Sequence, residues 1–178
     1  MALSDYESAS ELVRFSESSQ SGRKFTLSED LFRVLSHGQE LSHETDGCFD
    51  VTIGPLSRLW RIARFRKKMP PEEKLAAALD RVGYQSMRLS AKDRTGILTT
   101  PGMVLDLGGI AKGYAADRMV ETLKGKGLSR CLIDAGGDLV LGDPPRGAPG
   151  WRVEIGGLQH PDLPVLHLSN LAVATSGD

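Results

Sequence analysis

The chain has 178 residues, the size of one ordinary domain that can bury a core without disulfides. Hydrophobic residues make up 40% and charged residues 25%, a mixture typical of a globular protein that excludes collagen, a coiled coil and a membrane span. The net charge of -1 gives no general attraction to nucleic acid or to an acidic membrane, so any site for a polyanion has to be local.

Apolar residues at helical spacing predict two helices in the first half of the chain. The first covers residues 28–45, where Thr26 and Glu29 have the spacing of a capping box. The second follows the proline pair at 70–71 and ends at Gly83. Its apolar face is expected to consist of Leu75, Leu79 and Val82.

Short strands are predicted from apolar and β-branched runs bounded by turn residues. A third helix is predicted over residues 110–123. Hairpins mixed with helices favour an α+β layer fold over a doubly wound one. We expect a single domain, without repeats or linkers. The predicted strands are residues 48–53, 86–90, 96–99, 103–107, 131–134, 151–155 and 165–176, the last folding at Ser169 and Asn170.

The segment 103–114 carries the clearest chemical signal. A strand delivers Asp106, Gly108 and Gly109 let the backbone bend, and Lys112 follows at a predicted helix N-terminus. Such a loop suits a phosphate or pyrophosphate, with Asp106 placed to bind a ribose, a base or Mg²⁺. The glycine spacing is neither that of a dinucleotide fingerprint nor that of a P-loop. From these residues alone, a phosphate-binding loop and a glycine-rich turn with a surface lysine both stay open.

The other candidate motifs are weaker. The acid-flanked glycines of segment 134–138 favour a plain hairpin turn. Ser176 lacks the surroundings of a hydrolase nucleophile. The histidines do not have the spacing of metal ligands and are interpreted as solvated or hydrogen-bonded side chains: His37, His43, His160 and His167.

The stretch from Arg58 to Lys68 interleaves basic residues with aromatic ones, as a nucleic-acid contact can. Most such runs are solvated faces, and the balanced charge of the chain argues against a polyanion partner. We therefore expect no nucleic-acid partner.

Taken together, the motifs resemble the ApbE family of FAD:protein FMN transferases. Each motif alone is weak, but their order and spacing match the family over nearly the whole chain. The resemblance rests on Ser4–Tyr6 with Ser10–Arg14, Phe49–Leu56 with Leu59–Trp60, Asp106–Asp117, Asp134–Asp138, Trp151–Val153 and Ala174–Gly177.

The resemblance implies an α+β, T-fold-like ApbE-type domain with antiparallel sheets and packed helices. It implies an enzyme that uses Mg²⁺ to split FAD, passes FMN to a threonine hydroxyl of a target protein and releases AMP. The functional roles known in the family are carried over to the residues of this chain that match its motifs, although no catalytic residue is assigned. Tyr6 would pack against the flavin, Cys48, Phe49 and Asp50 would line the FAD site, Asp106 and Lys112 would bind adenosine and phosphate, and the Gly109 carbonyl would bind the metal.

Family members continue beyond the Thr175-Ser176-Gly177 turn with an acidic segment that supplies metal ligands. We therefore expect the chain to be incomplete at both ends and by itself to bind metal poorly, so that whether it is active alone stays open. The resemblance also suggests a lipid-anchored protein on the periplasmic side of the inner membrane, with a membrane contact only through an N-terminal anchor. Two alternatives stay open: a non-catalytic flavin-binding module and a Mg²⁺-dependent FAD pyrophosphatase.

Overall fold

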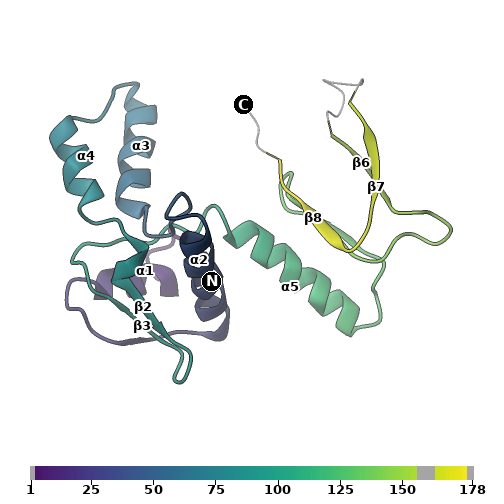
Figure 1. The fold of residues 1–178 in the computed structure, drawn as a ribbon, viewed down its shortest axis with the longest axis horizontal. Coiled ribbons are helices and arrows are strands. Elements are labelled where there is room, and N and C mark those ends of the chain that lie inside the picture. The colour runs from purple at the N-terminus through teal and green to yellow at the C-terminus, as the bar shows by residue number, and fades with distance from the viewer. Residues whose placement is uncertain (1–2, 156–162, 176–178) are drawn as a thin grey trace. The chain divides into compact units, whose positions relative to one another are not determined.

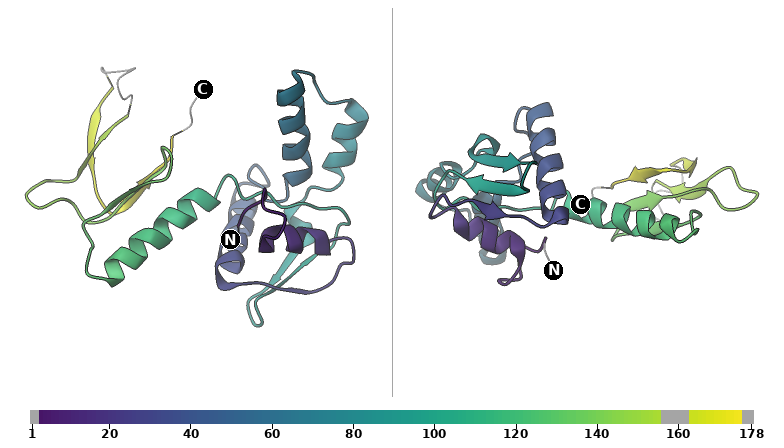
Figure 2. Two further views of the ribbon diagram at one scale, coloured as in Figure 1. Left: turned by 180° about the vertical axis from the view of Figure 1, so that it is seen from behind. Right: turned by 90° about the horizontal axis from the view of Figure 1, so that it is seen from below.

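The computed structural model describes residues 3–155 and 163–175 and divides the chain into two compact units, Met1–Ile110 and Ala111–Asp178. Each unit combines helices with antiparallel strand pairs, as the ribbons in Figures 1 and 2 show. The predicted α+β class is therefore confirmed. The assignment of one functional domain stays a prediction.

The first unit contains a three-stranded sheet in which the central strand β3 pairs antiparallel with both β1 and β2. The hairpin predicted from the runs at 86–90 and 96–99 is confirmed, with Leu89 opposite Gly96. The elements of this unit are α1 (Glu11–Ser18), β1 (Phe25–Thr26), α2 (Glu29–Glu44), α3 (Gly54–Arg66), α4 (Glu72–Leu79), a 3₁₀ turn (Tyr84–Ser86), β2 (Met87–Ser90) and β3 (Thr95–Leu98).

Helix α1, which we did not predict, supplies much of the core of the first unit. Its Leu12 and Phe15 are completely buried. Ser10 caps the helix by accepting a hydrogen bond from the Val13 N–H at 3.1 Å. The Phe15 ring packs over β3 at Gly96, where an added Cβ would lie 2.5 Å from the ring, so a larger residue there would displace the helix.

The helix predicted over residues 28–45 is confirmed as α2. The predicted cap was wrong, because Thr26 lies in β1 and Ser28 is the N-cap, accepting a hydrogen bond from the Leu31 N–H at 3.3 Å. Glu11 of α1 accepts the Ser28 N–H at 2.6 Å. A carboxylate from another helix thus performs the task that a capping box assigns to a residue within the helix.

The strands predicted at 48–53 and 103–107 were wrong, because both segments are irregular. In the first, the Asp50 carboxylate accepts the Thr52 N–H at 2.7 Å and holds the chain in a turn. In the second, alternating apolar side chains are buried although the segment does not form a strand. Its buried side chains are Met103, Leu105 and Leu107.

The helix predicted after the proline pair is confirmed as α4, but its end and its apolar face differ from the prediction. The helix stops at Leu79, ahead of Gly83. Leu79 is 57% exposed, whereas Ala78 is completely buried. The side chain that packs inward is thus a small one.

The second unit packs one helix against a small sheet, with a separate two-stranded ribbon. The helix predicted over 110–123 and most of the predicted strands are confirmed, and Ala116, Val120 and Val140 form the core. The elements are α5 (Ala111–Gly125), β4 (Leu132–Asp134), β5 (Leu139–Leu141), β6 (Trp151–Glu154), β7 (Val165–Leu168) and β8 (Leu171–Val173).

The strand predicted over 165–176 is interrupted at Asn170, whose φ of 52° ends the extended run. Its two halves join different sheets, since β7 pairs with β6 and β8 pairs with β5. The break at Ser169 and Asn170 is thus confirmed, but it is a crossover between sheets. Ser176 and His160 lie outside the described residues.

The glycine cluster at 134–138 is the tight turn of the β4–β5 hairpin, as predicted. The Ala135 N–H donates to the Asp138 carbonyl at 2.8 Å. Gly136 and Gly137 have φ values of 72° and 94°, which a two-residue hairpin turn of this type requires. None of the helices in the described ranges is long and apolar enough to span a bilayer.

Candidate functional site

A pocket of about 510 Å³ lies in the first unit, between one face of α3 and the two irregular segments that were predicted as strands. Its volume falls in the range of small-molecule sites. The lining residues are Cys48, Phe49, Asp50, Ile53, Ser57, Trp60, Arg61, Arg64, Asp106, Gly108 and Gly109.

The α3 wall of the pocket is a stripe at helical spacing. Ser57, Trp60, Arg61 and Arg64 occupy positions i, i+3, i+4 and i+7, which places them on one helix face. The wall therefore combines an indole ring with two guanidinium groups, a surface suited to a ligand that is aromatic and anionic.

A close backbone approach fixes the start of α3 against the segment that carries Asp106. Ile53 and Val104 form an isolated parallel bridge, and the Gly54 N–H donates to the Val104 carbonyl at 3.1 Å. An added Cβ at Gly54 would lie 2.5 Å from that carbonyl oxygen, closer than real contacts allow. Glycine at this position therefore lets the two walls of the pocket come together.

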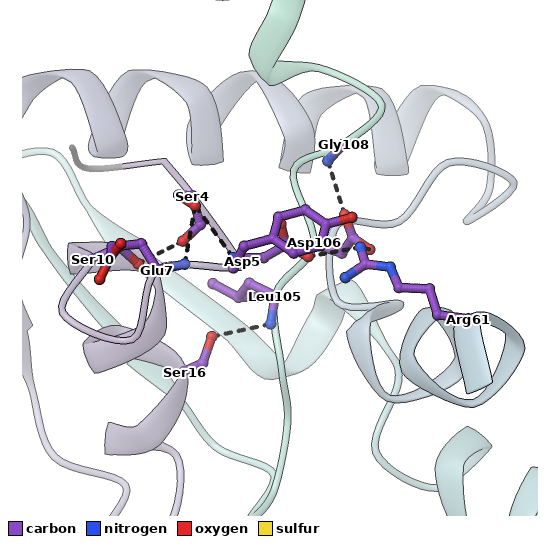
Figure 3. A network of polar contacts seen from close by, with 10 residues as sticks. Ser4, Asp5, Glu7, Ser10, Ser16, Arg61, Leu105, Asp106 and Gly108 are labelled. Atoms are coloured by element: carbon purple, nitrogen blue, oxygen red, sulfur yellow. Dashed lines mark hydrogen bonds and ion pairs between the residues drawn. The ribbon is translucent and has the colours of Figure 1, made fainter. Parts of the chain in front are cut away.

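Asp106 and Arg61 form the charged centre of the pocket (Figure 3). The Arg61 guanidinium lies 2.9 Å from Asp106 Oδ2 and 2.7 Å from a carboxylate oxygen of Asp5. The other Asp106 oxygen accepts the Gly108 N–H at 2.9 Å. The hydrogen bond to Asp5, with a smaller contribution from the charge of Asp106, raises the pKa of Arg61 above its usual range.

Tyr6 joins this cluster through its ring. The Arg61 guanidinium carbon lies 4.7 Å from the centre of the Tyr6 ring, a cation–π contact. Tyr6 itself is 80% exposed, so most of the ring is open to a ligand. Arg61 thus links the N-terminal segment, α3 and the Asp106 loop within the first unit.

Asp50 has a structural role at the edge of the pocket. One carboxylate oxygen accepts both the N–H and the hydroxyl of Thr52 at 2.7 Å, and the other accepts the Tyr84 N–H at 2.9 Å. The Thr52 hydroxyl in turn accepts the Gly83 N–H at 2.8 Å. This network fixes the turn that presents Cys48 and Phe49.

The glycine pair of the predicted phosphate loop lies within the same pocket. An added Cβ at Gly109 would lie 3.1 Å from the Phe49 ring, and one at Gly108 would lie 3.1 Å from Asp106 Oδ1. The glycines therefore allow close packing of the two irregular segments, independently of any ligand.

The structure brings five predicted site residues to one pocket: Cys48, Phe49, Asp50, Asp106 and Gly109. Tyr6 lies beside it, against Arg61. Lys112 belongs to the second unit, where it is in the first turn of α5 and pairs with Asp138 at 2.7 Å. The joint use of Asp106 and Lys112 at one ligand stays a prediction, because the two residues belong to different units.

Sequence reasoning missed the α3 wall of the site. Residues 58–68 were interpreted as a solvated run, and the stripe formed by Trp60, Arg61 and Arg64 was not recognised because no helix was predicted there. A Gly-Pro pair at a helix start was available as a signal, since proline is favoured in the first turn.

No group of three or more potential metal-ligating side chains occurs among the described residues. His43 contacts the Tyr84 ring edge-on at 4.8 Å, and His37 lies 3.2 Å from Glu40. In the pocket, both oxygens of Asp106 are already engaged. The described side chains therefore do not make a Mg²⁺ site by themselves, since such a site needs free carboxylates or phosphates.

The ApbE family matches residues 1–178, and the chain belongs to this family. It is 30% identical, over 99% of its length, to a FAD:protein FMN transferase of Haemophilus influenzae, and 32% identical, over 86% of its length, to one of Escherichia coli. It covers 53% and 44% of these two relatives, so it spans about half their length.

Solved structures of the same family share the fold. A flavin transferase ApbE from Vibrio cholerae, the H257G mutant, superposes with a TM-score of 0.87 at 28% identity, covering 99% of this chain and 56% of that one. The apo form of a flavinyl transferase ApbE from Pseudomonas stutzeri gives 0.84 at 28% identity, covering 99% and 55%. The expected ApbE-type architecture is thus confirmed.

Proposed function

We propose that the protein containing this chain transfers FMN from FAD to a threonine hydroxyl of a target protein. The threonine oxygen forms a bond to the phosphorus of the FMN half, the bond from that phosphorus to AMP breaks, and AMP leaves. The observation that carries the proposal is the pocket in the first unit, which gathers four residues predicted for the FAD site and Gly109, the predicted metal ligand. The names of the relatives support the same chemistry.

In this proposal, each wall of the pocket has a distinct task. Phe49, Trp60 and the exposed Tyr6 ring offer aromatic surface to the flavin. Arg61 and Arg64 offer positive charge to the diphosphate. Asp106, held in place by Gly108 and Arg61, presents its carboxylate to the adenosine half.

Lys112 extends the proposal to the second unit. It lies in the first turn of α5, where backbone N–H groups and the helix dipole favour an anion. Its ion pair with Asp138 would have to exchange for a phosphate contact. The exposed side chain of Lys112, 56% accessible, permits that exchange.

Mg²⁺ belongs to the proposal through the family resemblance. When bound, it would stabilise the charge that develops on the diphosphate. The resemblance assigns one metal ligand within this chain, the Gly109 carbonyl. The described residues offer no cluster of carboxylates that would complete the metal site. A lipid anchor and a periplasmic location are proposed on the same resemblance.

One alternative follows from this lack of carboxylates, namely a flavin-binding module without turnover. Incubating the purified protein with FAD, Mg²⁺ and a threonine-bearing target distinguishes the possibilities. Transfer predicts AMP and a covalently flavinylated target detected by mass spectrometry. Free FMN with AMP would identify a pyrophosphatase, and flavin binding without AMP would identify the module. The absence of any flavin binding would contradict the whole proposal.

A further inference from the structure

The hairpin of α3 and α4 carries more positive charge than the flavin pocket uses, since only Arg61 and Arg64 line that pocket. Between Val51 and Pro71 the sequence contains six lysines and arginines and no acidic residue, although the whole chain has a net charge of -1. Arg61 is paired with Asp5 and Asp106. Four of the other cations form no ion pair in the described part of the chain: Arg64, Arg66, Lys67 and Lys68.

The same region exposes large apolar side chains. Phe65 is 89% exposed, Met69 66% and Ile62 50%. The loop that joins α3 to α4 lies at the end of the hairpin remote from the β1–β3–β2 sheet (Figure 1). We call the exposed apolar side chains Ile62, Phe65 and Met69 together with the cations outside the flavin pocket, Arg66, Lys67 and Lys68, the hairpin tip. A protein in water gains nothing from such exposure, so the tip has the composition of a contact surface.

A groove of about 260 Å³ lies at the side of this tip. Trp60, Ala63 and Met69 supply apolar lining, and Arg64, Lys67 and Lys68 supply the charged part. Lys67 ends α3 in the left-handed conformation, with φ of 48°. The groove thus combines apolar surface with clustered cations, as an amphiphile with an anionic headgroup requires.

We propose that the hairpin tip binds the surface of an anionic phospholipid bilayer. Phe65, Met69 and Ile62 would enter the boundary between headgroups and acyl chains, while the cations contact lipid phosphates. Nucleic acid explains the exposed apolar side chains less well, because Ile62 and Met69 offer no stacking face to a base. The inference does not require flavin transfer, although Trp60 and Arg64 line both the groove and the flavin pocket.

Vesicle binding tests the proposal with the whole chain. The protein is sedimented with vesicles of phosphatidylcholine, with or without one third phosphatidylglycerol, at low and high salt. We expect binding to the anionic vesicles alone, weakened by salt. Emission from Trp60, which is 46% exposed in the groove, should shift to the blue on binding, and the shift should disappear in Trp60→Phe.

Two variants separate the contributions of charge and apolar surface. Lys67→Glu with Lys68→Glu should weaken partitioning at least about 25-fold, roughly five-fold for each basic residue. Phe65→Ser with Met69→Ser should weaken it about ten-fold at unchanged charge. The matched control, Arg23→Glu with Lys92→Glu, makes the same charge change at exposed positions elsewhere in the first unit and should leave most of the binding intact. Circular dichroism verifies that each variant is folded.

Three results would overturn the inference. The first is no partitioning into phosphatidylglycerol vesicles at low salt. The second is equal loss of binding in the tip variant and in the control, which would show a general charge effect. The third is tighter binding to a single-stranded oligonucleotide than to vesicles, lost in the charge variant but retained in Phe65→Ser with Met69→Ser, which would identify a nucleic-acid surface.

Discussion

Arg61 and Asp106 are 45 positions apart in the sequence and form an ion pair of 2.9 Å at the centre of the pocket. The same guanidinium binds Asp5 and lies against the Tyr6 ring. One side chain of α3 therefore contacts two of the residues predicted to bind FAD, Tyr6 and Asp106. In the proposed function, Arg61 holds these side chains in place, offsets the charge of two carboxylates and offers positive charge to the diphosphate.

Replacing Arg61 with alanine should weaken FAD binding about ten-fold. The variant leaves Asp5 and Asp106 without their cation, beside a dianionic ligand. Quenching of flavin fluorescence measures the dissociation constant. Arg66→Ala, the same truncation on the same helix but outside the pocket, should bind FAD as the parent does. Unchanged or tighter binding by the Arg61 variant would show that the ion pair competes with the ligand.

Asp50→Ala should destabilise the first unit by about 2 kcal/mol, because the Thr52 and Tyr84 N–H groups lose their acceptor. Urea unfolding followed by circular dichroism measures the change. Asp80→Ala, at an exposed position, serves as the control. If Asp50→Ala reduced flavin binding with no loss of stability, its role would be in the ligand contact and not in the turn.

Gly54→Ala should lower the free energy of unfolding by about 1–3 kcal/mol, because the new Cβ would meet the Val104 carbonyl oxygen at 2.5 Å. Flavin binding should weaken as well, since the α3 wall has to shift. Gly113→Ala makes the same chemical change in α5, where nothing lies within 4 Å of the added Cβ. That variant should be unchanged or more stable by up to about 1 kcal/mol. Similar effects of both substitutions on thermal unfolding would disprove the argument from close approach.

The first unit should lose stability in acid partly through Asp93. Hydrogen bonds from Lys24, Ser90 and Thr95 lower the pKa of this carboxyl in the folded state. A lowered pKa contributes stability above the ordinary value near 3.9, and the contribution is lost as the pH falls below it. Comparing urea midpoints at pH 7 and pH 3 should therefore show a smaller acid loss in Asp93→Asn than in the parent. An identical pH dependence in both proteins would refute this assignment.

The sequence predicted helices best where periodicity and capping agreed. Helices α2, α4 and α5 were predicted because each shows local signals that act within a few residues. Helix α3 escaped prediction although Gly54 and Pro55 mark its start. Its exposed Ile62 and Phe65 obscure the helical pattern, because exposure depends on what the hairpin contacts and not on local preference.

The two segments that were wrongly predicted as strands show a second limit of prediction from local sequence patterns. Residues 48–53 and 103–107 have strand-like composition, and Met103, Leu105 and Leu107 are buried although neither segment forms a strand. What prevents a strand at 48–53 is the Asp50 carboxylate, which takes up backbone donors as far away as Tyr84. A partner 34 positions distant leaves no trace in a local pattern.

Sequence alone determined the α+β class, most of the secondary structure and five residues that meet at one pocket, because these depend on composition, short-range periodicity and motifs in fixed order. Only the tertiary structure revealed that Arg61 binds Asp5 and Asp106, that Asp50 stabilises a turn, and that Gly54 admits the close approach of two segments. Those relationships join residues far apart along the chain, and their distances are set by the packing of the folded unit.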